Sequence, residues 1–125
     1  MHYISIPPKV ICQKLLNTKY VEGIVQILCI YYDVREPKIM IPEQGKIWTK
    51  FMNSGTQTVD GQHSAGTIWL TYQPKPHTIF HEFFHYLLWT SNVQVFGYDQ
   101  KRDHDERSEE IFATAFADAI VRLGS

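Results

Sequence analysis

"TIFHEFFHYL", Thr78 to Leu87, carries two histidines four positions apart, with a glutamate directly after the first. Residues four apart on an α-helix project from the same face about one turn along. His81 and His85 can therefore direct both imidazole rings at one metal ion, and neutral imidazole is a ligand that suits zinc. The HExxH spacing thus predicts a metal-binding helix.

Glu82 follows His81 directly, so its side chain points about 100° around the helix from that of His81. A carboxylate beside a metal can take a proton from an attacking water, which makes Glu82 the expected general base and not a ligand. Two buried histidines without partners would cost stability, whereas a shared metal would satisfy both. The large apolar neighbours that favour burial are Ile79, Phe80, Phe83, Phe84, Leu87 and Leu88. The competing interpretation is a metal-free helix.

A catalytic zinc usually takes a third protein ligand and leaves the fourth position for water. The last helical pattern, ERSEEIFATAFADAIVRL, supplies candidates, because Glu110 lies beside its apolar stripe among small residues that would let the helix approach the histidines. Glu106 and Glu109 are typical of solvated carboxylates in a first helical turn. The rival ligands are Asp103, His104 and Asp105.

Two segments, GTIWLTYQPKPHTIFHEFFHYLL and EIFATAFA, together resemble the ImmA/IrrE-type zinc metallopeptidases of the gluzincin group. Those proteins show an edge strand, an HExxH helix and a downstream motif of the form E-x-E-A-N-x-F-A. This chain has the first Glu, the first Ala and the final Phe-Ala of that motif. The resemblance implies that His81, His85 and Glu110 bind a single Zn²⁺ and that Glu82 is the general base.

The chain departs from the family pattern at three positions. Phe112 replaces the second acidic residue of the downstream motif, and Thr114 replaces its Asn. Phe84 stands where the family often has Gly. Thr114 lies one turn after Glu110, where gluzincins commonly place a polar residue that orients a metal ligand, and a hydroxyl can serve that role.

The other patterns predict an α+β fold, and the resemblance implies that residues 1–125 form one minimal zincin-like domain. Apolar spacing predicts N-terminal helices before and after Thr18, which is a candidate N-cap, with one longer helix as the alternative. Residues 38–41 (KIMI) and 66–72 (GTIWLTY) are typical of strands, and glycines between residues 43 and 66 indicate turns between further short strands.

These segments predict a small, mostly antiparallel sheet followed by the HExxH helix and a C-terminal helix that bears the third ligand. In a zinc peptidase, the strand before the HExxH helix often forms the rim of the cleft, where an extended substrate adds to its exposed edge. GTIWLTY is the expected edge strand. Asp103 and Glu106, in capping-box spacing, are expected to open the last helix.

Some residues outside the motif have an expected role, and others have none. Tyr98, His104 and Arg107 are candidate donors to the oxyanion of a tetrahedral intermediate, with plain surface residues as the alternative. The remaining histidines, His2, His63 and His77, carry no spacing signal and are expected to be ordinary. Cys12 and Cys29 are expected to be buried free thiols, and the spacing leaves a disulfide open.

The formal net charge of −1 gives no indication of nucleic-acid or anionic-membrane binding. The longest apolar stretch, GIVQILCIYY, is too short to span a bilayer, and the N-terminus lacks the pattern of a signal peptide, so a cytoplasmic location is expected. The favoured function is a zinc metalloendopeptidase acting on a protein or peptide substrate. The alternatives are a non-catalytic, zinc-stabilised binding module of zincin shape and a metal-free helical protein.

Overall fold

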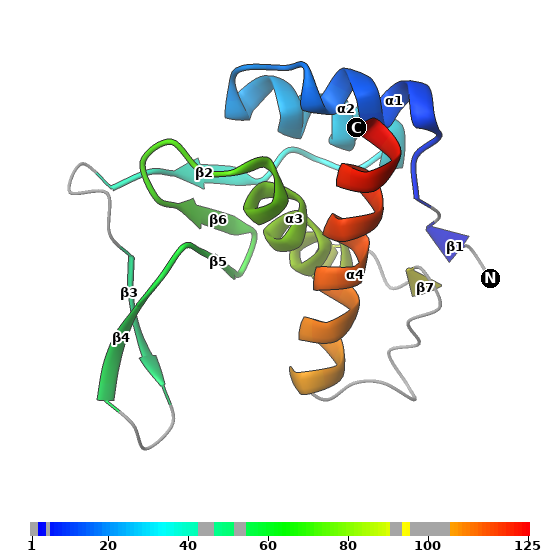
Figure 1. The fold of residues 1–125 in the computed structure, drawn as a ribbon. Helices are drawn as coiled ribbons and strands as arrows, with labels where there is room; N and C mark the ends of the chain where they lie inside the picture. The colour runs from blue at the N-terminus through cyan, green and yellow to red at the C-terminus, as the bar shows by residue number, and fades with distance from the viewer. Residues whose placement is uncertain (1–2, 5, 43–46, 52–54, 91–93, 96–105) are drawn as a thin grey trace.

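The computed structural model describes residues 3–4, 6–42, 47–51, 55–90, 94–95 and 106–125 (Figure 1). Within these ranges the chain forms four helices and seven strands, which confirms the predicted α+β class. The helices are α1 (Lys9–Leu16), α2 (Val21–Tyr32), α3 (Pro76–Thr90) and α4 (Glu106–Gly124). The strands are β1 (Tyr3–Ile4), β2 (Lys38–Met40), β3 (Ile47–Phe51), β4 (Gly55–Val59), β5 (Gly61–Ser64), β6 (Thr67–Leu70) and β7 (Gln94–Val95).

The N-terminal region forms two separate helices rather than one longer helix. Pro8 precedes α1 in an extended conformation. The prediction that Thr18 caps α2 is wrong, because Tyr20 is the cap residue and makes no side-chain capping bond. The Thr18 hydroxyl instead donates to the carbonyl of Lys14 at 2.7 Å. A threonine hydroxyl can bond back to a carbonyl four residues earlier, and here that bond closes the end of α1.

β2, β6 and β5 form a three-stranded sheet in that order. β6 runs parallel to β2 and antiparallel to β5, so this sheet is mixed and not mostly antiparallel. A separate antiparallel pair, β3–β4, projects from the rest of the molecule, and β1 pairs with β7 in parallel (Figure 1).

The expectation that GTIWLTY forms an edge strand is wrong. Its strand portion, β6, lies in the middle of the three-stranded sheet. Ala65 and Gly66 both have positive φ, 47° and 88°, and this turn folds β5 back along one side of β6. β2 pairs along the other side, so the edges of the described sheet are β2 and β5.

The HExxH helix α3 lies at the centre of the molecule, between the sheet and α4 (Figure 1). It is buried on most of its surface, and Phe80, Phe83 and Phe84 are fully buried. Ile68 and Leu70 reach it from β6 and are also fully buried. Burial of large apolar side chains is the main stabilising term of such a core, at roughly 1.5–3 kcal/mol for each one. The motif therefore lies on a helix that is packed into the core.

α4 packs closely against α3, because its contacting face carries small residues. Ala113 and Ala117 are fully buried there, and the Phe84 and Phe116 rings lie 5.6 Å apart between centroids. The close approach expected from the small residues of this helix is confirmed. Among the described residues, no helix is long and apolar enough to cross a membrane. Cys12 and Cys29 are both buried and unpaired.

Candidate metal centre

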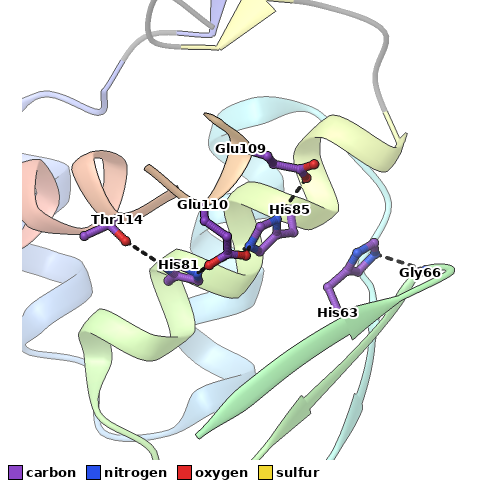
Figure 2. A network of polar contacts seen from close by, with 7 residues as sticks. All are labelled: His63, Gly66, His81, His85, Glu109, Glu110 and Thr114. Atoms are coloured by element: carbon purple, nitrogen blue, oxygen red, sulfur yellow. Dashed lines mark hydrogen bonds and ion pairs between the residues drawn. The ribbon is translucent and has the colours of Figure 1, made fainter. Parts of the chain in front are cut away.

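His81, His85 and Glu110 converge at the interface of α3 and α4 (Figure 2). The Nε2 atoms of the two histidines lie 3.3 Å apart. The Glu110 carboxylate bridges them, with Oε2 2.9 Å from Nε2 of His81 and Oε1 2.7 Å from Nε2 of His85. One potential ligand atom from each residue lies within 4.8 Å of the others. The three predicted ligands are thus brought together.

The geometry of the three residues fits a zinc ion. Tetrahedral zinc with Zn–N distances of 2.0–2.1 Å requires ligand atoms about 3.3–3.4 Å apart. The two Nε2 atoms already have this separation. The Glu110 side chain is 57% exposed, so it can move outward from hydrogen-bonding distance to make room for an ion. Two imidazoles and one carboxylate are a ligand set found in catalytic zinc sites.

The second ring nitrogen of each histidine also has a partner on α4. Nδ1 of His85 lies 2.9 Å from Oε1 of Glu109, and Nδ1 of His81 lies 3.4 Å from Oγ1 of Thr114 (Figure 2). A histidine that bonds through one nitrogen presents the other to a metal in a fixed orientation. These contacts therefore favour Nε2 as the metal-facing atom of both rings.

Glu109 has a different environment from the one expected. The prediction of a solvated carboxylate is wrong, because its side chain is only 29% exposed and contacts His85. Neighbouring residues on a helix point about 100° apart. Because α4 packs against α3 with both residues near His85, Glu109 contacts Nδ1 of the ring and Glu110 contacts Nε2.

The contacts within the centre shift the pKa values of His85 and Glu110 in opposite directions. Burial lowers the pKa of His85, but its hydrogen bonds to Glu109 and Glu110 outweigh burial and raise that pKa from 6.5 to about 10. Hydrogen bonds to His81 and His85 lower the pKa of Glu110 well below its usual range. Without a metal, the site thus favours a protonated His85 facing an ionised Glu110. A divalent cation would take the place of that proton.

Glu82 is buried beside this cluster. It is 7% exposed and is the one buried charged side chain in the part of the chain that the structure describes. No hydrogen bond joins its carboxylate to another described residue. Burial raises its pKa, while the nearby charges of His85 and His81 act in the opposite direction. Burying a carboxylate that has no hydrogen bond to a described residue is costly, which makes Glu82 a candidate for a functional role.

His63, which was expected to be ordinary, lies close to the centre on β5. Its Nε2 accepts the backbone N–H of Gly66 at 3.1 Å (Figure 2). Its ring stands edge-on to Tyr86 and Trp89, with centroids 5.9 Å apart in each case. Burial lowers the pKa of His63, and the charge of His85 lowers it further. No motif spacing marks this residue, since only the pairing of β5 brings it to α3.

The remaining candidates are not brought to the centre by the described structure. His77 pairs with Asp118 at 2.7 Å near the N-terminus of α3. Arg107 is exposed in the first turn of α4. Four candidates lie outside the described residues: Tyr98, Asp103, His104 and Asp105. Their expected roles, including the capping box of Asp103, therefore stay predictions. The same holds for His2 and the side chain of Glu106.

Comparisons with family models, curated proteins and solved structures find no match for this chain. The fold and the site define a small α+β protein with a three-stranded mixed sheet and a His–His–Glu group that could hold a metal ion.

Proposed function

We propose that this chain is a zinc-dependent metallopeptidase that hydrolyses peptide bonds in a protein or peptide substrate. The observation that carries the proposal is the buried Glu82 carboxylate, which has no hydrogen bond to any described residue and lies beside the converging Nε2 atoms of His81 and His85. A structural metal site has no use for such a carboxylate. A hydrolase needs one to accept a proton. The resemblance to ImmA/IrrE-type peptidases agrees with this proposal.

The residues have distinct tasks in the proposed reaction. His81, His85 and Glu110 would hold a zinc ion, which when bound polarises a carbonyl and makes water more acidic. Glu109 keeps the His85 ring in place through Nδ1. Glu82 takes a proton from the attacking water and passes it to the leaving amine. Its raised pKa makes the carboxylate a better proton acceptor near neutral pH.

The sheet supplies a place for an extended substrate. Because β6 is central, the strand next to the proposed base is β5, not β6. β5 runs along α3, with Gly61 beside Glu82 and His63 beside Tyr86. The side of β5 away from β6 pairs with no other described strand. A peptide adding to that edge in β-strand form would lie along the centre.

The test of this proposal is the substitution Glu82→Gln. Glutamine keeps the size and a hydrogen-bonding oxygen but cannot accept a proton at neutral pH. We expect the variant to fold and bind zinc while losing on the order of 10² to 10⁴ in turnover. Cleavage of a peptide library is measured for both forms at equal zinc occupancy. Glu22→Gln, an exposed carboxylate in the first turn of α2, is the matched control and should cleave like the wild type.

Two outcomes would contradict the proposal. Equal cleavage by the wild type and Glu82→Gln would remove Glu82 from the mechanism. Absence of cleavage by the wild type, together with zinc-dependent capture of a partner protein, would favour the alternative of a non-catalytic binding module.

A further inference from the structure

Gly61, the first residue of β5, lies against the side chain of Glu82. A Cβ atom added to Gly61 would stand 2.8 Å from Cγ of Glu82 and 3.2 Å from its Oε2. It would also stand 2.9 Å from Cγ2 of Thr78 on the preceding turn of α3. Carbon atoms in van der Waals contact are about 3.5–4.0 Å apart. The strand therefore passes over Glu82 at a distance that only a glycine permits.

The backbone conformation does not explain this glycine. Among the described residues, Gly66 is the one glycine with positive φ, at 88° in the turn between β5 and β6. Gly61 lies outside that range and pairs regularly with Leu70 in the antiparallel ladder. Any residue could adopt its backbone angles. Glycine fits this position because it has no side chain, and the space that a Cβ would need is occupied by Glu82 and Thr78.

A side chain at position 61 would displace Glu82 more readily than the strand or Thr78. The strand is held by its pairing with Leu70, which is fully buried, and by a hydrogen bond from Thr71 N–H to the Asp60 carbonyl at 3.2 Å. Thr78 is β-branched, so its short side chain has fewer rotamers on a helix than that of Glu82. Glu82 has the more flexible side chain, so it would move.

We propose that Gly61 is a positioning residue that holds the Glu82 carboxylate beside His81 and His85 by leaving space for it. This inference rests on the proposed function, since it matters for catalysis only if Glu82 is the base. Any side chain at position 61 turns the carboxylate away from its place without touching the zinc ligands.

The contact is tested first without reference to activity. Gly61→Ala, Glu82→Ala and the double variant are compared with the wild type by thermal unfolding of the zinc-free protein. We expect Gly61→Ala to lower Tm in the wild-type background and to lower it less in the Glu82→Ala background, because the contact with Cγ of Glu82 is then removed and only the one with Cγ2 of Thr78 remains. Gly23→Ala is the matched control. Its Cβ would meet Thr18 at 2.9 Å, far from the centre, so its effect should add independently to that of Glu82→Ala.

The catalytic consequence is measured on the zinc-loaded protein. Gly61→Ala should lower kcat on the order of 10- to 100-fold while KM and zinc affinity stay within about twofold. A general loss of structure would instead reduce zinc affinity as well. If Gly61→Ala does not fold, recovery of folding in the double variant supports the contact with Glu82.

Three results would overturn the inference. The first is an equal fall in Tm in both backgrounds, and the second is failure of both the single and the double variant to fold. The third is an unchanged kcat for folded Gly61→Ala. A wild type that cleaves nothing would instead defeat the proposed function, and the unfolding cycle would still decide whether Gly61 fixes the place of Glu82.

Discussion

At the scale of single residues, the centre is defined by the two nitrogens of each histidine. Nε2 of His81 and Nε2 of His85 face one another across Glu110, while both Nδ1 atoms contact residues of α4. Because Nδ1 of each ring is bonded to α4 and Nε2 faces Glu110 and the other histidine, Nε2 is the favoured metal-binding atom. This division of partners also gives two adjacent glutamates different proposed tasks, with Glu110 a metal ligand and Glu109 a partner of Nδ1 of His85.

The two glutamates should therefore differ in their effect on zinc binding. Glu110→Ala removes a proposed ligand and should weaken zinc binding by several orders of magnitude. Glu109→Ala removes the carboxylate that orients His85 and should weaken zinc binding about 10- to 100-fold. The measurement is competition for zinc with a chromophoric chelator.

The control for this comparison is Asp118→Asn. It removes an α4 carboxylate that pairs with His77 and lies outside the centre. Its zinc affinity should match that of the wild type. A Glu109→Ala variant with wild-type affinity would show that the Glu109–His85 contact does not support the site.

The residues of the centre were predictable from sequence to different degrees. The spacing of His81 and His85 determines their convergence through local helix geometry, so that convergence could be predicted from the sequence. Glu110 could be proposed because small residues mark the face of α4 that approaches α3. The contact of Glu109 with His85 could not be predicted, because it depends on how α4 packs against α3. His63 depends on strand pairing in the same way.

At the scale of elements, α3 and α4 are joined by polar contacts along their interface in addition to their apolar packing. His77 pairs with Asp118 near one end, and His81 and His85 pair with Glu110 further along. These contacts shift the pKa values of His85 and Glu110, so the stability of the zinc-free interface should depend on pH.

The direction of that dependence follows from two shifted groups. The pKa of His85 is raised from 6.5 to about 10, so its stabilising contribution is complete below pH 6.5 and is lost as pH rises toward 10. The pKa of Glu110 is lowered from 4.5, so its contribution is present above pH 4.5 and is lost as pH falls. We expect the contribution of this pair to the Tm of chelator-treated protein to be greatest between pH 4.5 and 6.5.

Thermal melts of the zinc-free wild type and of His85→Gln, recorded from pH 4 to pH 9, isolate this contribution. The Tm advantage of the wild type should shrink as pH rises above 6.5. Zinc should act in the opposite sense, because it must displace about one proton from His85 and so binds more tightly at higher pH. A wild-type advantage that grows from pH 6.5 to pH 9 without zinc would contradict the assigned ion pair.

Strand order could not be predicted at this scale. Alternation in GTIWLTY correctly indicates a strand, but alternation does not say which strands pair on either side of it. The turn at Ala65 and Gly66 brings β5 to one side of β6, and β2 reaches the other side from a distant part of the chain. As a result the edge next to Glu82 belongs to β5.

At the scale of the whole molecule, the fold places the HExxH helix in the core and covers it with α4 on one side and the sheet on another (Figure 1). The α+β class and the helix order could be predicted from apolar periodicity, since each helix buries one face in a common core. The small sheets could not, because short strands separated by glycines carry little periodic signal. We propose that a zinc ion joins α3 to α4 in this arrangement.

The most direct test of that claim is a crystal structure of protein purified without chelators, with anomalous data collected on both sides of the zinc edge. We predict one zinc peak at about 2.0–2.1 Å from Nε2 of His81 and from Nε2 of His85, with a Glu110 oxygen as the third protein ligand. Protein that carries no zinc and gives no peak after soaking in zinc, or a peak held by other residues, would contradict it.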